Sequence, residues 1–431
     1  MWKVLLVKIA MKVFKFGGAS VKDAQSIKNV GEVLRREGFE SCLLVVSAMG
    51  KTTNALEKVC LEFIETARIG ESLEPVVEYH KAIIEELFEP SHSLFSELEL
   101  IFDQLRGFTL EEDKGGYDYY YDQIVSFGEL ISSKILSAYL LELGFLHEWL
   151  DARNYILTDS TYREGEVNWE DTLMRIKEIS PEGSYVTQGF IGSDIEKQTV
   201  TLGREGSDYS AAIFAYGLDA DSMTIWKDVP GVMSGDPRKF HKVTLLEEIS
   251  FEEAIEMAYY GASVIHPKTM QPLQRKNIPF FVKSFLEPDK KGTKISSAEH
   301  LNKVESYILK ENQYLLTLST KDFSFIAEEH LSEIFRLLSA FQIKISLMQN
   351  TAISLELCLE DKYNTIDNLL TSLEPEFSIH LQEGLSLLTV RNTDGRESKR
   401  FTEGKTVYLE QTSNEVLQFV FRPDLDLPII P

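Results

Sequence analysis

The chain has 431 residues, a length typical of two or three domains, of which 43% are hydrophobic and 26% charged. This composition is typical of a globular protein with a large buried core. The 44 basic and 68 acidic residues give a formal net charge of −24. Such a charge repels nucleic acid and anionic membranes, and argues against a protein that tracks either surface.

The cysteines and the first residues indicate a cytoplasmic protein. Cys42, Cys60 and Cys358 lie in apolar stretches without paired metal-ligand spacing, which favours buried, reduced thiols. The apolar run at residues 4–10 is shorter than the roughly 20 residues of a membrane-spanning helix. No small-residue cleavage site follows it. We interpret residues 1–10 as an extension before Met11, where a strand pattern begins.

The first 285 residues alternate between strand and helix patterns. Strand patterns fall at residues 12–16, 42–47, 145–150, 185–190, 223–228 and 279–285. Helical patterns follow Ser20, which we expect to cap a helix reaching about residue 36, and cover residues 54–106 and 117–143. The alternation predicts an α/β domain over residues 1–285 with a mainly parallel sheet.

The pattern changes after a linker near residues 284–300. Strand patterns then fall at residues 305–309, 314–318, 343–348, 353–359, 385–390, 406–410 and 416–421. Helical patterns lie between them at residues 330–341 and 363–373. Residues 286–431 are therefore predicted to form an α+β region of the ferredoxin-like kind, long enough for two small units.

The first candidate site segment is KFGGAS, residues 15–20. Lys15 ends a strand, Gly17 and Gly18 follow, and Ser20 precedes a helix. Backbone N–H groups, the helix dipole and the ammonium group would together cradle a phosphate. The alternative is a plain strand–turn–helix with a solvated lysine.

Two common nucleotide motifs are absent from the sequence. The KFGGAS segment lacks the third glycine of a dinucleotide fingerprint, and Val45 stands where a P-loop ending in Gly50-Lys51-Thr52 requires glycine.

Two further segments carry polar residues in apolar surroundings. Ser47 and Thr53 belong to a hydroxyl-rich loop after a strand, where open α/β sheets bind ligands, although Thr53 could instead cap a helix. Glu129 stands in SFGEL within an otherwise apolar helix. It is either a site residue or an exposed helix residue.

The fourth segment is TLGREGSDYSAA, residues 201–212. Its Arg204 is suited to bidentate capture of a carboxylate. Ser207 and Asp208 open a helix, which Asp208 could simply cap. We expect Glu205 to point to solvent.

The fifth segment is IWKDVPGVMSGDPR, residues 225–238. Asp228 could meet a ribose or a base edge, and Arg238 a phosphate. The alternative is a long structural loop.

These five segments, in this order, resemble the aspartokinases of the amino-acid kinase superfamily, and the remaining residues resemble their regulatory ACT domains. The matching text also includes TQGFIG and YYGASVIHP. The resemblance implies a three-layer kinase fold and transfer of the ATP γ-phosphate to the side-chain carboxylate of L-aspartate. A carboxylate with a pKa of about 4 is already ionised at neutral pH, so no general base is needed. Catalysis then reduces to positioning and charge stabilisation.

The resemblance also assigns roles to the acceptor-site residues. Lys15 would neutralise the transferred phosphoryl group, and Asp208 would organise that lysine. Arg204 would hold the α-carboxylate of aspartate and Glu129 its α-ammonium group. The residues expected to orient aspartate are Ser47, Thr53 and Ser207.

The nucleotide would be bound by backbone donors at Gly17 and Gly18, by Ser20, and by residues 227–238. In that loop the resemblance assigns roles to Lys227, Asp228, Met233 and Arg238. Met233 replaces a tyrosine found near adenine in many relatives, Ser263 replaces a lysine, and Ala19 replaces a threonine. Mg²⁺ is expected to be held mainly by phosphates and water, so no protein metal ligand is assigned.

In the family, one ACT unit is inserted into another. Here residues 313–383 would be inserted into a unit made of residues 303–312 and 384–425. Polar residues of one strand pair would face an amino-acid effector: Ser346, Gln349, Asn350 and Thr351. A simple hairpin is the alternative. Glu329 and His330 stand where lysine-inhibited relatives have glycine, so the effector stays open, and edge strands favour a homodimer or higher oligomer.

Two rival functions stay open at this stage. The first is another phosphotransferase of the same superfamily, acting on glutamate, acetylglutamate, carbamate or a nucleoside monophosphate. The second is a non-catalytic amino-acid sensor, which would require damage at Lys15, Arg204 or Asp208. No such damage is visible in the sequence.

Overall fold

The structure is a computed structural model that describes residues 11–109, 116–262, 265–298, 303–322, 324–393, 399–413 and 415–423. The chain forms two compact units. The first consists of Met1–Val232, Glu247–Ile255 and Ser263–Leu301, and the second of Met233–Leu246, Glu256–Ala262 and Asn302–Pro431. Residues 233–246 and 256–262 thus pack with the second unit and residues 286–298 with the first, whereas the sequence pattern placed the domain boundary at residue 285.

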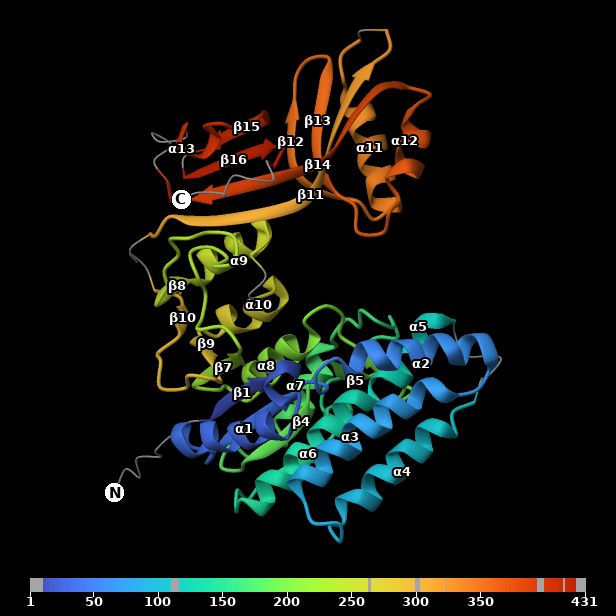
Figure 1. The fold of residues 1–431 in the computed structure, drawn as a ribbon, viewed down its shortest axis with the longest axis vertical. Helices are drawn as coiled ribbons and strands as arrows, with labels where there is room; N and C mark the ends of the chain where they lie inside the picture. The colour runs from blue at the N-terminus through green and yellow to red at the C-terminus, as the bar shows by residue number, and fades with distance from the viewer. Residues whose placement is uncertain are drawn as a thin grey trace. The chain divides into compact units, whose positions relative to one another are not determined.

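An eight-stranded sheet forms the centre of the first unit, with the order β3-β4-β2-β1-β7-β9-β10-β8 (Figure 1). Neighbouring strands are parallel except for β9 and β10. The predicted mainly parallel sheet is confirmed. The strands are β1 Lys12–Phe16, β2 Cys42–Val46, β3 Glu148–Leu150, β4 Tyr185–Gln188, β7 Ser222–Lys227, β8 Glu248–Ser250, β9 Phe280–Ser284 and β10 Thr293–Ser296. A separate hairpin joins β5 Ile191–Ser193 to β6 Thr199–Thr201.

Helices lie on both sides of this sheet, which gives the three-layer arrangement (Figure 1). Helix α8 contacts β1, β2 and β7, whereas α6 contacts β2 and β4. The helices of the first unit are α1 Ala24–Glu37, α2 Thr52–Thr66, α3 Glu74–Leu87, α4 Leu94–Arg106, α5 Tyr117–Val125, α6 Phe127–Glu142, α7 Trp169–Ile176, α8 Gly206–Gly217 and α10 Pro267–Arg275. Helix α9 Phe251–Tyr260 is divided between the two units. The helical patterns over residues 54–106 correspond to three helices, α2, α3 and α4.

The core of the first unit explains the apolar strand patterns. All five residues of β2 are buried, as expected for a strand covered on both faces. Trp226 of β7 stacks on Phe16 of β1 with ring centroids 6.1 Å apart. Cys42 and Cys60 are buried and free, as is Cys358 in the second unit, which confirms the prediction for the thiols.

The predicted cap of the first helix is wrong. Asp23, not Ser20, caps α1, because its carboxylate accepts a hydrogen bond of 2.7 Å from the Ser26 backbone N–H. Ser20 lies in a short 3₁₀ helix, Gly18–Val21, and its hydroxyl donates to the Trp226 backbone oxygen at 3.1 Å. Ser20 therefore joins the turn after β1 to the end of β7.

The stretch from Tyr117 to Glu142, which forms α5 and α6, is long and apolar enough to cross a membrane by length and composition. Within the described residues it is mostly buried inside the first unit. The core helices of globular proteins have the same property.

The second unit contains a six-stranded antiparallel sheet in the order β12-β13-β11-β14-β16-β15. Helices α11 Glu328–Ala340 and α12 Ile366–Leu373 pack on it through an apolar cluster that includes Leu316 and Leu357. The remaining elements are β11 Ser306–Thr320, β12 Lys344–Asn350, β13 Ser354–Glu360, β14 Phe377–Arg391, β15 Val407–Ser413, β16 Val416–Phe421 and the four-residue α13 Lys399–Thr402.

Two strands of this sheet are longer than predicted. The patterns at residues 305–309 and 314–318 are parts of the single strand β11, which is irregular between Lys310 and Leu315. Asn312 there adopts a left-handed conformation with φ +55°. This local distortion interrupts the alternation of polar and apolar residues, so the sequence reads as two strands.

Candidate active site

Three charged side chains meet where β1 and β7 end and α8 begins. The Lys15 Nζ lies 2.5 Å from Asp208 Oδ1, and the Lys227 Nζ lies 3.6 Å from Asp208 Oδ2. Lys15 and Asp208 are only 8% and 3% exposed. Since β1 and β7 are adjacent parallel strands, their carboxyl ends bring the two lysines to the same edge of the sheet. The structure therefore brings together three residues that are distant in sequence.

Asp208 stays ionised in this cluster. Burial alone would raise the pKa of its carboxyl group, but the charges of Lys15 and Lys227 outweigh burial and leave the pKa below its ordinary value. The three groups carry a net charge of about +1 at neutral pH. The carboxylate pairs with lysines, and Glu205 occupies the N-cap position of α8, so the alternative role of Asp208 as a helix cap is not observed.

Gly18 allows the turn after β1 to contact the loop after β2. A Cβ atom at Gly18 would lie 2.7 Å from the Ala48 backbone oxygen, which is closer than real side chains come. The Gly50 N–H donates to the Gly18 oxygen at 3.0 Å, and the Ser47 N–H donates to the Phe16 oxygen at 3.1 Å. These contacts place the two predicted loops side by side at the carboxyl edge of the sheet.

The hydroxyl-rich loop contributes two half-buried side chains, Ser47 and Thr53. The Ser47 backbone oxygen accepts a 2.6 Å hydrogen bond from Ser132 of α6. Thr53 is the second residue of α2, and Lys51 is the N-cap residue without a side-chain cap. The alternative role of Thr53 as a helix cap is therefore not observed.

Glu129 is buried rather than exposed. It is 2% exposed, and its Oε1 accepts a hydrogen bond of 3.2 Å from the Ala48 backbone N–H. Among the described residues, its Oε2 has no hydrogen-bond partner. Burial raises the pKa of this carboxyl group to about 8. The charge of Lys15 opposes this rise only in part, and an ammonium group in contact with the carboxylate would satisfy the free oxygen.

Arg204 and Ser207 flank the start of α8. Arg204 is exposed, and within the described ranges it forms no ion pair with a protein carboxylate. Ser207 is buried next to Gly189, where a Cβ atom would come within 2.6 Å of the Ser207 Cβ. The close approach holds the end of β4 against the first turn of α8.

The expectation that Glu205 points to solvent is wrong. The side chain is half-buried, and its Oε2 has no solvent contact and no hydrogen-bond partner in the described part of the chain. Its backbone has φ +54°, a left-handed conformation. Burial raises the pKa of its carboxyl group and Asp208 adds to the rise, while Lys227 and Arg204 oppose it. In the sequence, the only indication that Glu205 joins the charged cluster was its place directly after Arg204 and three residues before Asp208.

The predicted nucleotide residues divide between the two units. Lys227 and the exposed Asp228 belong to the first unit. Met233 and Arg238 belong to the second, where the exposed Arg238 guanidinium group pairs with Asp236 at 2.8 Å. A common nucleotide site for these residues stays a prediction. Ser263 lies outside the described residues.

The predicted effector residues lie on and after an edge strand. Ser346, Gln349 and Asn350 belong to β12, and Thr351 follows it. The Ser346 Oγ accepts a 3.2 Å hydrogen bond from Lys310. The Thr351 hydroxyl lies 2.7 Å from the Ser354 hydroxyl, within the hairpin that joins β12 to β13. The hairpin is observed, and the effector role stays a prediction.

The mainly parallel sheet carries a lysine–aspartate–lysine cluster at its carboxyl edge. This arrangement is typical of enzymes that bind and transfer phosphate groups. A sequence model of the amino acid kinase family matches residues 10–284. This match covers more than half of the chain, so the chain belongs to the amino acid kinase family.

Relatives that match nearly the whole chain narrow the assignment within this family. Lysine-sensitive aspartokinase 3 of Escherichia coli (strain K12) is 33% identical over 408 residues, which cover 92% of this chain and 90% of that protein. A crystal structure of E. coli aspartokinase III with lysine and aspartate (T-state) has a TM-score of 0.79, 29% identity and 95% coverage of both chains. The structure with aspartate and ADP (R-state) has a TM-score of 0.79, 28% identity and 96% coverage of both. Within the family, this chain is an aspartokinase.

Proposed function

We propose that the chain transfers the γ-phosphoryl group of ATP to the side-chain carboxylate of L-aspartate, giving 4-phospho-L-aspartate and ADP. A carboxylate oxygen attacks the γ-phosphorus and forms a new O–P bond. The bond from that phosphorus to the β,γ-bridging oxygen breaks, and ADP leaves with its electron pair. No proton moves, because the acceptor, with a pKa of about 4, is already ionised.

The observation that carries this proposal is the cluster of the buried Lys15 and Asp208 with the half-buried Lys227. Two anions must approach each other during the reaction, so the main barrier is electrostatic repulsion. Lys15 would stabilise the charge on the transferred group, and Lys227 the charge on the nucleotide. Asp208 holds the Lys15 ammonium group in place, at 2.5 Å, so that little reorganisation is needed.

The acceptor would be held at both of its α-substituents. Glu129, with a free buried oxygen, would accept hydrogen bonds from the α-ammonium group. The exposed Arg204 would bind the α-carboxylate with two parallel hydrogen bonds. Hydroxyl groups of Ser47, Thr53 and Ser207 would orient the molecule between them.

The nucleotide would bind along the carboxyl edge of the sheet. Backbone N–H groups of Gly17 and Gly18 would contact its phosphates, and Asp228 would contact the ribose or base. Ser20 would support the site indirectly, because its hydroxyl is bound to the Trp226 oxygen. We retain Met233, Arg238 and Ser263 as further candidates for nucleotide contacts.

Mg²⁺ fits this site as a companion of the nucleotide. No cluster of three acidic, histidine or cysteine side chains able to hold a metal ion occurs among the residues the structure describes. Mg²⁺ usually binds nucleotide phosphates and keeps several waters. When bound, it would neutralise part of the charge on the phosphates, and Lys15 and Lys227 would neutralise a further part.

For regulation, we propose an amino-acid effector at the β12–β13 hairpin, with ACT-like units that pair into a homodimer or higher oligomer. The E. coli relative is named lysine-sensitive, which makes lysine the first effector to test, with threonine next. The predicted units are residues 313–383, inserted into 303–312 plus 384–425. We further propose a cytoplasmic location and a role in the first step of lysine (diaminopimelate), threonine and methionine biosynthesis.

A hydroxamate assay of the purified chain with ATP and Mg²⁺ tests the proposal. Hydroxylamine traps an acyl phosphate, so aspartate should give hydroxamate and glutamate should give little. Product formed faster with glutamate would support a different superfamily phosphotransferase. Aspartate or lysine binding by calorimetry without any hydroxamate would support the non-catalytic sensor.

A further inference from the structure

Helix α5 is hydrogen-bonded to strand β6 through one fully buried carboxylate. Asp122 is 0% exposed. Its Oδ1 accepts a 2.7 Å hydrogen bond from the Thr201 hydroxyl, and its Oδ2 accepts bonds of 2.8 and 2.9 Å from the backbone N–H groups of Thr201 and Arg163. A carboxylate with these three donors is tied to β6 and to the loop around Arg163 at once.

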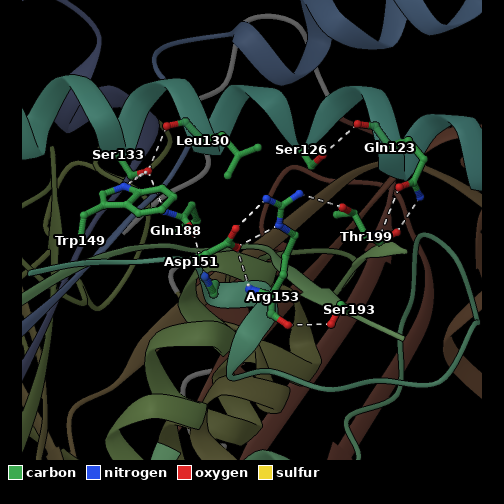
Figure 2. A network of polar contacts seen from close by, with 11 residues as sticks. Gln123, Ser126, Leu130, Ser133, Trp149, Asp151, Arg153, Gln188, Ser193 and Thr199 are labelled. Carbon is green, nitrogen blue, oxygen red and sulfur yellow. Dashed lines mark hydrogen bonds and ion pairs between the residues drawn. The ribbon is translucent and has the colours of Figure 1, made fainter. Parts of the chain in front are cut away.

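The next residue strengthens the same attachment. The Gln123 side-chain amide pairs with the Thr199 backbone, accepting from its N–H at 3.1 Å and donating to its oxygen at 2.8 Å (Figure 2). The Gln123 amide thus makes the two backbone hydrogen bonds that a neighbouring strand would otherwise make to Thr199. Figure 2 also shows the Arg153 guanidinium group between Asp151 and the Thr199 hydroxyl, the latter at 3.3 Å. Both ends of β6 are therefore fixed by buried polar groups.

The attachment connects the two segments that carry the proposed acceptor-binding residues. Asp122 lies seven residues before Glu129, about two helical turns along α5 and α6. Thr201 lies three residues before Arg204, which limits the distance between them to about 10 Å. The position of Arg204 relative to Glu129 therefore depends on where α5 holds β6.

We propose that Asp122 is a positioning residue that sets the separation between Glu129 and Arg204, and thereby fits the acceptor site to the α-ammonium and α-carboxylate groups of one amino acid. This inference rests on the proposed function, because it uses the acceptor roles given to those two residues. Asp122 itself touches no substrate.

Asparagine is the informative replacement for Asp122. The two residues have nearly the same shape, but the amide has one acceptor oxygen and one NH₂ group. The amide can keep all three contacts only with its oxygen on the two backbone N–H groups and its NH₂ group on the Thr201 hydroxyl, which must then turn to accept. The charge-assisted bonds of the carboxylate are then replaced by weaker bonds to a neutral amide, so the attachment of β6 to α5 is loosened. The Thr201→Val variant is milder, because it removes only the hydroxyl bond and keeps the backbone N–H.

The same hairpin provides a matched control at its other end. Asp194 is 4% exposed, and its carboxylate accepts bonds from the Ser160 and Tyr162 hydroxyls at 3.0 and 3.1 Å. It also accepts bonds from the Glu196 and Gln198 N–H groups at 3.0 and 2.9 Å. Asp194 follows β5, before the turn, whereas Thr201 ends β6 beside the Arg204 loop. Asp194→Asn therefore disturbs a comparable network that reaches the same loop, at Ser160 and Tyr162, but bonds the turn residues Glu196 and Gln198 in place of Thr201.

The experiment measures kcat, the KM of aspartate, the KM of ATP and the thermal midpoint for the wild type and the variants Asp122→Asn, Thr201→Val and Asp194→Asn. We expect Asp122→Asn to raise the aspartate KM at least about tenfold, since small displacements of binding groups have large effects, with the ATP KM within about twofold. Thr201→Val should show a smaller rise in the same direction. Asp194→Asn should lower the thermal midpoint but leave the aspartate KM within about twofold.

An unchanged aspartate KM in Asp122→Asn, or an equal rise in Asp194→Asn, would overturn the proposal. If Asp122→Asn does not fold, Thr201→Val decides by the same criterion. Calorimetric titration with aspartate keeps the test separate from the proposed function. Wild-type protein that binds aspartate but forms no product would refute the kinase reaction, while the affinities of the variants would still decide the role of Asp122.

Discussion

The Asp208 carboxylate lies 2.5 Å from the Lys15 ammonium group, and both side chains are more than nine-tenths buried. Removing one partner from such a pair leaves a buried charge without compensation, which typically costs about 3–5 kcal/mol. The second contact of Asp208, to Lys227, is longer at 3.6 Å. The shorter contact should therefore dominate the effect of mutating Asp208.

We expect Asp208→Asn to lower kcat by about 10² to 10³, the range seen when one preorganised electrostatic group is removed. The aspartate KM should change little, because Asp208 is not assigned to acceptor binding. Steady-state kinetics with both substrates measures the effect. Asp171→Asn, in the first turn of α7, where the carboxylate accepts a 2.6 Å bond from the Asn168 amide, is a control for replacing a carboxylate with an amide. A wild-type kcat in Asp208→Asn would contradict the proposed organisation of Lys15.

The raised pKa of the Glu129 carboxyl group predicts that the affinity for aspartate depends on pH. With the site empty, the pKa of its carboxyl group is about 8, so the group is mostly protonated at pH 7. An ammonium group requires the ionised form, so binding must release a proton. The aspartate KM should therefore fall by up to about tenfold per unit as pH rises from 6 towards 8, and level off above that.

Glu129→Gln should remove most of this pH dependence and weaken aspartate binding. Proton release, measured by calorimetry in buffers of different ionisation enthalpy, gives an independent check. A flat aspartate KM between pH 6 and 8 in the wild type would show that Glu129 is already ionised in the empty site.

The same carboxyl group should affect folding stability in a defined direction. The folded protein holds the proton up to about pH 8, whereas the unfolded chain releases it near the ordinary value of 4.5. The folded state thus binds more protons in this interval, and the contribution of Glu129 lowers the free energy of unfolding as pH rises from 4.5 to 8. Urea unfolding at several pH values should show a smaller decline in Glu129→Gln than in the wild type.

The sequence predicted the class of fold and the polar ends of the strands well, because both depend on local patterns. Buried parallel strands are continuous apolar runs, and β2 is such a run. Parallel strands share one carboxyl edge, so the strand patterns at residues 12–16 and 223–228, with Lys15 and Lys227 one residue before their last, are enough to place both lysines at that edge.

The features that the sequence did not predict depend on competition or on distant partners. Asp23 caps α1 in place of Ser20 because both are good cap residues and the chain turns once more before the helix begins. The buried carboxylate of Glu129 is hydrogen-bonded to the backbone N–H of Ala48, 81 residues away. A single glutamate in an apolar helix does not reveal which surface covers it.

Arg204 should contribute to aspartate binding and not to ATP binding. Its guanidinium group is exposed and forms no ion pair with the described carboxylates, so it is available to a ligand. We expect Arg204→Ala to raise the aspartate KM at least about tenfold, typical of losing a charge-assisted bidentate contact, with the ATP KM nearly unchanged. Arg175→Ala, an exposed arginine on α7 with only a 3.9 Å contact to Glu178, should change neither. Unaltered aspartate saturation in Arg204→Ala would show that another group binds the α-carboxylate.

Glu205 combines an unfavourable backbone conformation with a carboxylate beside the cation cluster. A non-glycine residue in the left-handed region costs about 1–2 kcal/mol, and its φ is +54°. Glu205→Gly should therefore raise the free energy of unfolding by about 1 kcal/mol, after allowing for the greater freedom of glycine in the unfolded chain. Glu205→Gln keeps the backbone cost and removes only the charge, so chemical denaturation of both variants separates the two effects. Because the carboxylate opposes phosphate near Lys227, both variants should bind ADP more tightly than the wild type in the absence of Mg²⁺. Equal ADP affinity in all three proteins would mean that the Glu205 carboxylate lies too far from the phosphates to affect their binding.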